Sequence, residues 1–235
     1  DVVAGVDFWE DAINTFNHNH KNNNGVVEDI KKFNTKHLPQ ILAKNKIIGV
    51  IGGPPCQGFS SARLSDSSKK MGKINEERNH LYIDFFNTVK KASPNFFLIE
   101  NVRGMVTLDK GAFVSDIYDR FGNLGYTVNH AILDSSDYGV PQARKRVFFI
   151  GIKGKKFIFP NKILKKVSAF EALSDLPKVD GSSEYLNKPK NKYQSEMRRN
   201  VTKLKNHEFT NHSEQTKDII SKVPDGGNIR SLPKE

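Results

Sequence analysis

The chain of 235 residues contains a single cysteine, Cys56, and a single tryptophan. One cysteine cannot form a disulfide within the chain, which excludes a disulfide-rich secreted scaffold. No apolar run approaches the roughly 18 to 20 residues that a membrane span needs, and no signal-peptide pattern is present. We therefore expect a cytoplasmic protein with a reduced thiol and no membrane partner.

Acidic residues are also scarce. Against 37 Lys and Arg there are 26 Asp and Glu, so the formal net charge is +11. Neutralisation of phosphates by Lys and Arg dominates nucleic-acid affinity, and this charge favours a polyanionic partner. A lysine-rich, solvated surface is the alternative.

Short apolar runs alternate with helical patterns over the first 165 residues. We expect strands at 2–6, 25–27, 47–51, 96–99, 128–133 and 147–151, and helices at 10–18, 35–44, 81–92 and 112–124. This alternation indicates a Rossmann-like α/β fold with a parallel sheet covered on both faces. A capping box, Ser168 with Glu171, predicts a short helix to about Ser174. Beyond it the composition turns polar, so we expect one domain over residues 1–177 and a second over 178–235.

Cys56 directly follows the apolar run 47–51 and the residues Gly52-Gly53-Pro54-Pro55. Such a strand end presents the thiol on a rigid loop at the carboxyl edge of the sheet, where ligands bind in open α/β folds. A buried, inert cysteine is the alternative. The surrounding prolines and glycines favour a functional thiol, because a plain core position does not require them.

Carboxylates follow the first two expected strands. Asp7 comes after the first strand, at a position where an acid typically accepts hydrogen bonds from ribose hydroxyls. Asp29 comes after the second, where it could accept from an adenine amino group, while Phe8 could stack on the purine. Both aspartates could instead be helix caps.

Two further groups follow later strands. Glu100 leaves the apolar run 96–99 beside the thiol loop, where partial desolvation would let it donate as well as accept hydrogen bonds. An ion pair with a nearby Arg or Lys is the alternative. Gln142, Arg144 and Arg146 fall on one face at period two, and the two guanidinium groups suit anionic or carbonyl oxygens. A solvated basic strand start would give the same pattern.

Metal binding is not expected. His18 and His20 lie two residues apart and His207 and His212 five apart. Neither a second cysteine nor an acidic cluster completes a ligand set.

Three motifs together resemble the cytosine-5 DNA methyltransferases of bacterial restriction-modification systems: PPCQGFS at 54–60, ENV at 100–102 and QARKR at 142–146. Lesser similarities lie at 1–19, 28–30, 78–81 and 168–177. The resemblance implies a methyltransferase domain that uses S-adenosylmethionine over residues 1–177. It also implies the beginning of a target recognition domain over 178–235.

The resemblance further implies a role for each residue. The Cys56 thiolate adds to carbon 6 of a cytosine flipped out of double-stranded DNA, and carbon 5 then takes the methyl group. Glu100 holds N3 and the exocyclic amine, while Arg146, supported by Arg144, faces the carbonyl oxygen at position 2. The implied DNA contacts are Gln57, Ser60, Gln142 and Arg144. The implied cofactor contacts are Asp7, Phe8, Asp29, Ile30, Pro55 and Leu81.

Some of the family's motifs have no counterpart in the chain. A glycine-rich turn would lie before Asp1, and two closing motifs after Glu235. We therefore expect the intact protein to be a monomer that needs further segments at both ends to complete the cofactor pocket, and this chain alone to bind the cofactor poorly.

Two alternatives stay open: an RNA (tRNA) cytosine-5 methyltransferase of the same fold, and a non-catalytic DNA-binding subunit. Residues 57–60 are more similar to those of the DNA enzymes. The set of Cys56, Glu100 and Arg146 argues against a protein that only binds.

Overall fold

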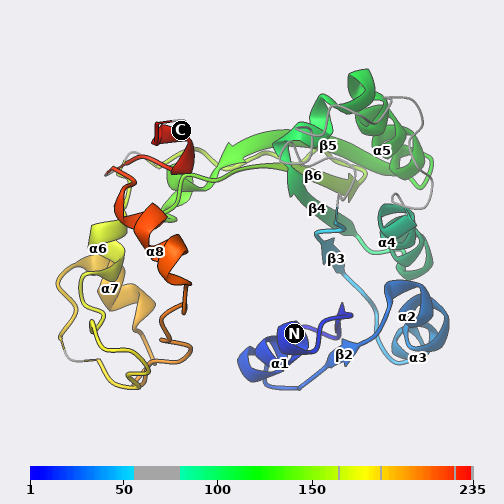
Figure 1. The fold of residues 1–235 in the computed structure, drawn as a ribbon. Helices are drawn as coiled ribbons and strands as arrows, with labels where there is room; N and C mark the ends of the chain where they lie inside the picture. The colour runs from blue at the N-terminus through cyan, green and yellow to red at the C-terminus, as the bar shows by residue number, and fades with distance from the viewer. Residues whose placement is uncertain (56–79, 164, 186, 225, 234–235) are drawn as a thin grey trace. The chain divides into compact units, whose positions relative to one another are not determined.

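The structure is a computed structural model that describes residues 1–55, 80–163, 165–185, 187–224 and 226–233 (Figure 1). The chain divides into two compact units, residues 1–166 and 167–235. The expected helix at 168–174 therefore lies in the second unit, and a functional boundary near Pro177 stays a prediction. No helix in the described ranges is long and apolar enough to cross a membrane.

A small parallel sheet begins the first unit. Strand β1 (Gly5–Asp7) pairs with β2 (Gly25–Val27), and helix α1 (Glu10–Asn19) connects them. The Glu28 N–H continues the ladder by donating to the Asp7 carbonyl oxygen at 3.0 Å. The carboxyl ends of the two strands therefore lie side by side.

The larger sheet has the order β3 (Gly49–Gly52), β4 (Phe96–Val102), β6 (Lys145–Lys153), β5 (Tyr126–Asp134). Strands β3 and β4 are parallel, but β6 runs antiparallel to both of its neighbours. The expectation of a parallel sheet is therefore wrong for β6, whereas the β1–β2 and β3–β4 pairs are parallel as expected and the Rossmann-like α/β class holds. The reason is the short β5–β6 connection, residues 135–144, because a parallel crossover needs a dozen or more residues.

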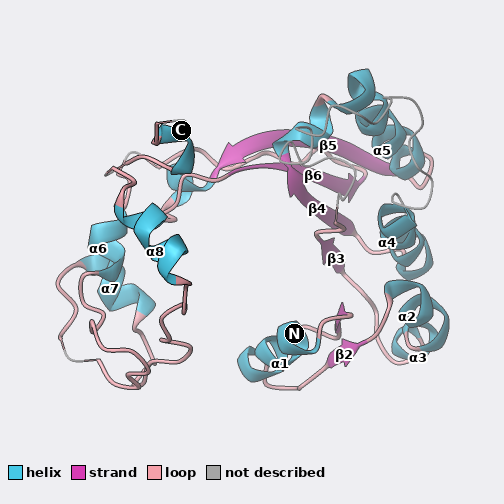
Figure 2. Cartoon of the chain, in the orientation of Figure 1, coloured by secondary structure: helices cyan, strands magenta, loops and turns pink. Residues whose placement is uncertain are grey.

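Helices α4 (His80–Ala92) and α5 (Ala112–Gly122) pack on one face of this sheet and bury the main apolar core (Figure 2). The Phe97 and Phe121 rings stack at 4.0 Å between their centroids. Phe97 also lies over Gly151 of β6, where an added Cβ would clash with the ring. Each large side chain buried in this way contributes about 1.5–3 kcal/mol.

Between β2 and β3 the chain forms two short helices, α2 (Ile30–Lys36) and α3 (Leu38–Leu42), instead of the one helix expected at 35–44. Pro39 lies in the first turn of α3, where its missing N–H costs nothing. Asp29 caps α2. The other connections contain the 3₁₀ turns η3 (Arg103–Val106), η4 (Leu108–Gly111) and η5 (Ser135–Tyr138).

The second unit contains three helices and a 3₁₀ turn in its described part: α6 (Ala169–Leu173), α7 (Lys192–Met197), α8 (Glu214–Ser221) and η6 (Ile229–Ser231). The capping box of Ser168 and Glu171 at α6 is confirmed. Gln194 of α7 is fully buried and donates to the Glu171 carbonyl oxygen at 2.7 Å. Polar contacts of this kind hold the unit together.

Candidate active site

The first and second motifs meet because β3 and β4 are parallel neighbours that end at the same edge of the sheet. A cavity of about 180 Å³ lies there. Its lining residues are Gly53, Pro54, Pro55, Glu100, Asn101, Val102, Arg144 and Arg146. Cys56, which follows the lining residue Pro55 in the sequence, falls outside the described residues, as do Gln57 and Ser60.

Glu100 and Arg146 form an ion pair at this cavity. Because Val102 lies opposite Arg146 in the antiparallel register, Glu100 and Arg146 are diagonal neighbours on one face. Arg146 Nε lies 3.0 Å from Glu100 Oε1, with the two side chains 22% and 36% exposed. The ion-pair alternative for Glu100 is therefore realised. A partly exposed pair is worth about 0–1 kcal/mol, so both groups can turn to a ligand at little cost.

Two neighbouring residues shape the loop before Cys56. At Gly53 an added Cβ would lie 3.3 Å from Glu100 Oε2, so glycine leaves room for that carboxylate. Asn101 is buried, and its Nδ2 donates to the Pro54 carbonyl oxygen at 2.9 Å. The sequence places Asn101 in the ENV motif but does not indicate a role for it. The signal that could have indicated its role is a polar residue at a core-facing strand position, because a buried polar side chain needs a hydrogen-bond partner.

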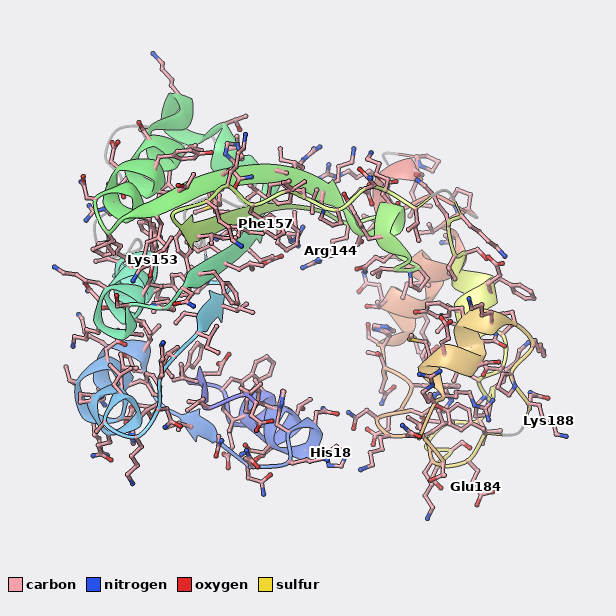
Figure 3. All side chains as sticks on the ribbon, turned by 180° about the vertical axis from the view of Figure 1, so that it is seen from behind. His18, Arg144, Lys153, Phe157, Glu184 and Lys188 are labelled. Carbon is pink, nitrogen blue, oxygen red and sulfur yellow. The ribbon has the colours of Figure 1, made fainter. Side chains whose placement is uncertain are left out.

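Of the three residues that the third motif was expected to place on one strand face, two line the cavity. Strand β6 begins at Lys145, so Gln142 and Arg144 precede it. Arg144 lines the cavity beside Arg146, but Gln142 is not among the lining residues. Gln142 instead lies in a bend, and its backbone carbonyl oxygen accepts a hydrogen bond from Ser135 Oγ at 2.6 Å. The Ser135 N–H donates to the Arg144 carbonyl oxygen. Arg144 lies just before β6 and Lys153 is the last residue of that strand, so the two lie far apart along it (Figure 3).

The predicted adenosine-binding residues lie at the carboxyl edge of the small sheet. Asp7 Oδ1 accepts from the Trp9 N–H at 2.9 Å. Asp29 Oδ1 accepts from the Lys31 N–H at 2.8 Å, so the helix-cap alternative for Asp29 is realised. The Phe8 ring is 78% exposed. An open aromatic face beside two carboxylates fits an adenosine group, whose ring stacks and whose hydroxyl and amino groups donate.

Comparison with known proteins decides the family. The model of the C-5 cytosine-specific DNA methylases matches residues 1–231. The chain belongs to the C-5 cytosine-specific DNA methylase family. The matched range includes the motifs at 54–60, 100–102 and 142–146.

Among individual methylases, the chain is 35% identical to Type II methyltransferase M.DdeI of Desulfomicrobium norvegicum, over 97% of this chain and 56% of that protein. It is 32% identical to M1.HphI of Haemophilus parahaemolyticus, over 99% of this chain and 57% of the relative. The chain thus spans somewhat more than half the length of these curated relatives.

Solved structures agree on the fold. A candidate DNA modification methyltransferase encoded within an E. coli prophage matches 80% of this chain and 52% of its own, with a TM-score of 0.63 and 30% identity. A DNMT2 mutant of Spodoptera frugiperda matches 76% of this chain and 53% of its own, with a TM-score of 0.52. At 19% identity the second match shows the fold alone.

Three other predicted cofactor residues of the methylase are placed as follows. Pro55 lines the cavity of about 180 Å³. Ile30 is the first residue of α2 and Leu81 lies in the first turn of α4, and both are half-buried. Within the described residues, no group of three or more His, Cys, Asp or Glu side chains is placed to hold a metal ion.

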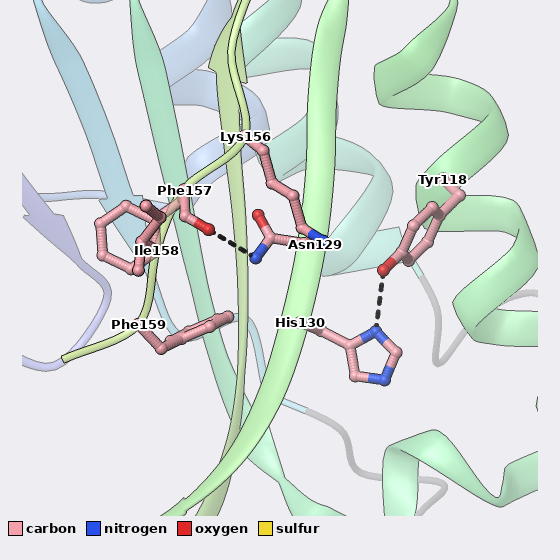
Figure 4. A pocket seen from close by; sticks show the side chains of 7 residues that line it. All are labelled: Tyr118, Asn129, His130, Lys156, Phe157, Ile158 and Phe159. Atoms are coloured by element: carbon pink, nitrogen blue, oxygen red, sulfur yellow. Dashed lines mark hydrogen bonds between the residues drawn. The ribbon is translucent and has the colours of Figure 1, made fainter. Parts of the chain in front are cut away.

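A larger cavity of about 560 Å³ lies beside β5, lined by Tyr118, Asn129, His130 and residues 156–159 (Figure 4). None of the predicted site residues lines it. Tyr118 Oη lies 3.0 Å from His130 Nδ1, and Asn129 Nδ2 donates to the Phe157 carbonyl oxygen. Burial lowers the pKa of His130 and raises the pKa of Tyr118.

Proposed function

We propose that the protein is a DNA (cytosine-5) methyltransferase that methylates carbon 5 of a cytosine flipped out of double-stranded DNA. One observation carries the proposal: Glu100 and Arg146 meet on one face of a cavity whose wall, residues 53–55, leads directly to Cys56. Family membership and the relatives' names support the same reaction. The proposed catalytic domain is 1–177, and 178–235 begins a target recognition domain.

Covalent activation is the central step. Carbon 5 of cytosine is a weak nucleophile, so the Cys56 thiolate adds to carbon 6 and places electron density on carbon 5. Glu100 holds N3 and the exocyclic amine, and Arg146 faces the oxygen at position 2, so both stabilise charge that develops after attack. Once carbon 5 carries the methyl group, loss of its proton and of the thiolate restores the aromatic ring.

S-adenosylmethionine is the proposed cofactor, and it supplies an electrophilic methyl group when bound. Asp7 and Asp29 accept from its hydroxyl and amino groups, and Phe8 stacks on its adenine. Apolar contacts come from Ile30, Pro55 and Leu81.

Double-stranded DNA is the proposed macromolecular partner. The net charge of +11 favours phosphate binding, with Gln57, Ser60, Gln142 and Arg144 as proposed contacts. A base stacked inside a duplex cannot reach a side-chain cavity, so the target must leave the helix. A monomeric, cytoplasmic enzyme stays a prediction.

A methylation assay tests the proposal. The full-length protein is incubated with S-adenosylmethionine and, in separate reactions, with duplex DNA or transfer RNA, and the nucleosides are analysed by mass spectrometry. We expect 5-methylcytosine in DNA and none in RNA. Methylation of transfer RNA alone would select the RNA alternative, and DNA binding without methylation would select a non-catalytic subunit.

A further inference from the structure

The two sheets of the first unit share no ladder hydrogen bonds in the described ranges, since β1 pairs with β2 and β3 pairs with β4. Within the described ranges, helix contacts connect them: α2, which follows Asp29, packs against α4, which contains Leu81. The α2–α4 contact therefore contributes to the position of the proposed adenosine-binding edge relative to the catalytic cavity.

Buried polar groups occupy that contact. Asn34 of α2 is 4% exposed and Thr88 of α4 is 9% exposed. Asn34 Nδ2 donates to the Asp84 carbonyl oxygen at 2.9 Å, and the Thr88 hydroxyl donates to Asn34 Oδ1 at 2.7 Å. The Lys91 ammonium adds a third bond, to the Asn34 carbonyl oxygen at 2.9 Å. Both the nitrogen and the oxygen of the Asn34 side-chain amide therefore have hydrogen-bond partners on α4.

Such a network differs from apolar packing in what it specifies. Apolar side chains of similar volume fill a contact in several registers at small cost. A buried amide loses its partners when the helices slide, and each unpaired group costs about 1–3 kcal/mol. The Asn34–Thr88 contact therefore favours one position of α2 against α4.

We propose that Asn34 and Thr88 are a positioning pair that sets the small sheet, with Asp7, Phe8 and Asp29, at the distance from the catalytic cavity that S-adenosylmethionine spans. The inference rests on the proposed function, because the cofactor does. The pair acts through these three residues and not by contact with the cofactor. Its loss weakens cofactor binding more than it slows the chemical step.

Thr88→Val in the full-length protein tests the pair, because it removes the hydroxyl and keeps the side-chain shape. We expect the dissociation constant for S-adenosylhomocysteine, measured by calorimetry, to rise about tenfold. We expect kcat on duplex DNA at saturating cofactor to change less than about twofold. Thr88→Ser keeps the hydroxyl and should bind like the wild type.

A double-mutant cycle assigns the effect to the contact. Asn34→Leu should raise the dissociation constant at least as much, because it also removes the bond to the Asp84 carbonyl oxygen. Asn34→Leu with Thr88→Val should be no worse than Asn34→Leu alone, because both changes break the Asn34–Thr88 bond. Additive effects would show that the two residues act separately and would overturn the inference.

The matched control is Val89→Ala. Val89 lies next to Thr88 on α4 but packs into the sheet core. Its truncation should lower the melting temperature without changing cofactor affinity. If Thr88→Val lowers only the melting temperature, or lowers kcat at constant affinity, the positioning role is wrong. If the wild type binds no S-adenosylhomocysteine, the proposed function fails first.

Discussion

The two sheet edges of the first unit, at β3–β4 and at β1–β2, differ in how many contacts already hold their predicted site residues in place. At the edge of β3 and β4, Glu100 is paired with Arg146 and the loop before Cys56 is tied to buried Asn101. At the edge of β1 and β2, the partners of the two aspartates among the described residues are backbone N–H groups nearby in the sequence, and Phe8 is largely exposed.

This difference separates two kinds of function. Groups that stabilise developing charge act best when they are fixed in advance, because no reorganisation is then needed during reaction. Groups that hold a cofactor can gain their contacts when it binds. Substitutions at the first edge should therefore change kcat, and substitutions at the second should change cofactor affinity.

Glu100→Gln should give the largest effect at the first edge. The amide keeps the shape but loses the charge that pairs with Arg146, so we expect kcat on duplex DNA to fall by about 100-fold or more. Affinity for S-adenosylhomocysteine should not change. Glu10→Gln, at an exposed position in the first turn of α1, is the control. A comparable loss of affinity in Glu100→Gln would contradict the division between the edges.

Asn101→Ala should have an intermediate effect. It removes the donor to the Pro54 carbonyl oxygen, so the loop before Cys56 loses its anchor. We expect about a tenfold fall in kcat and a loss of about 1–3 kcal/mol in the free energy of unfolding, measured by urea titration. Asn95→Ala, at an exposed position just before β4, should change neither. Lost stability with unchanged kcat would limit Asn101 to the fold.

Phe8→Ala should act at the second edge alone. Loss of a stacking face should raise the dissociation constant of S-adenosylhomocysteine about tenfold and leave the unfolding free energy within about 0.5 kcal/mol. Trp9, the single tryptophan, lies next to it and provides a fluorescence signal for the titration. Phe170→Ala, whose ring is 80% exposed in the second unit, is the control. Unchanged affinity in Phe8→Ala would place the adenine elsewhere.

The smallest expected effect lies at neither edge. Burial lowers the pKa of His130 in the folded protein, so the unfolded chain takes up this proton first as the pH falls. Stability from this group is therefore present above the ordinary histidine pKa and declines as the pH drops from 7 to 5. Between pH 7 and pH 5, the melting temperature of His130→Gln should fall by less than that of the wild type. An equal drop in both proteins would assign the pH dependence to other groups.

Local pattern in the sequence predicts most elements of the first unit but not their directions. The strands at 96–99 and 147–151 are apolar runs, and β4 and β6 contain them. The antiparallel direction of β6 depends on connection length, which an apolar run does not encode. The break between α2 and α3 follows from Pro39, although the 35–44 pattern suggested one helix.

The candidate site was predictable where chemistry marks a residue and unpredictable where only geometry does. Glu100 and Arg146 have side chains whose chemistry suggests a role, and the structure brings them together. The bond from Asn101 to Pro54 joins residues 47 positions apart and depends on the register of β3 and β4. Helix α7 was not predicted, because it has no apolar stripe and is held instead by the hydrogen bond from buried Gln194 to the Glu171 carbonyl oxygen.

Covalent trapping tests the central claim most directly. The full-length protein and its Cys56→Ser variant are incubated with S-adenosylmethionine and a long duplex in which 5-fluorocytosine replaces cytosine, then separated under denaturing conditions. Because fluorine cannot leave as the carbon 5 proton does, the account predicts a stable protein–DNA adduct with the wild type and none with the variant. A wild type that methylates ordinary DNA but forms no adduct, or a variant that still forms one, would contradict it.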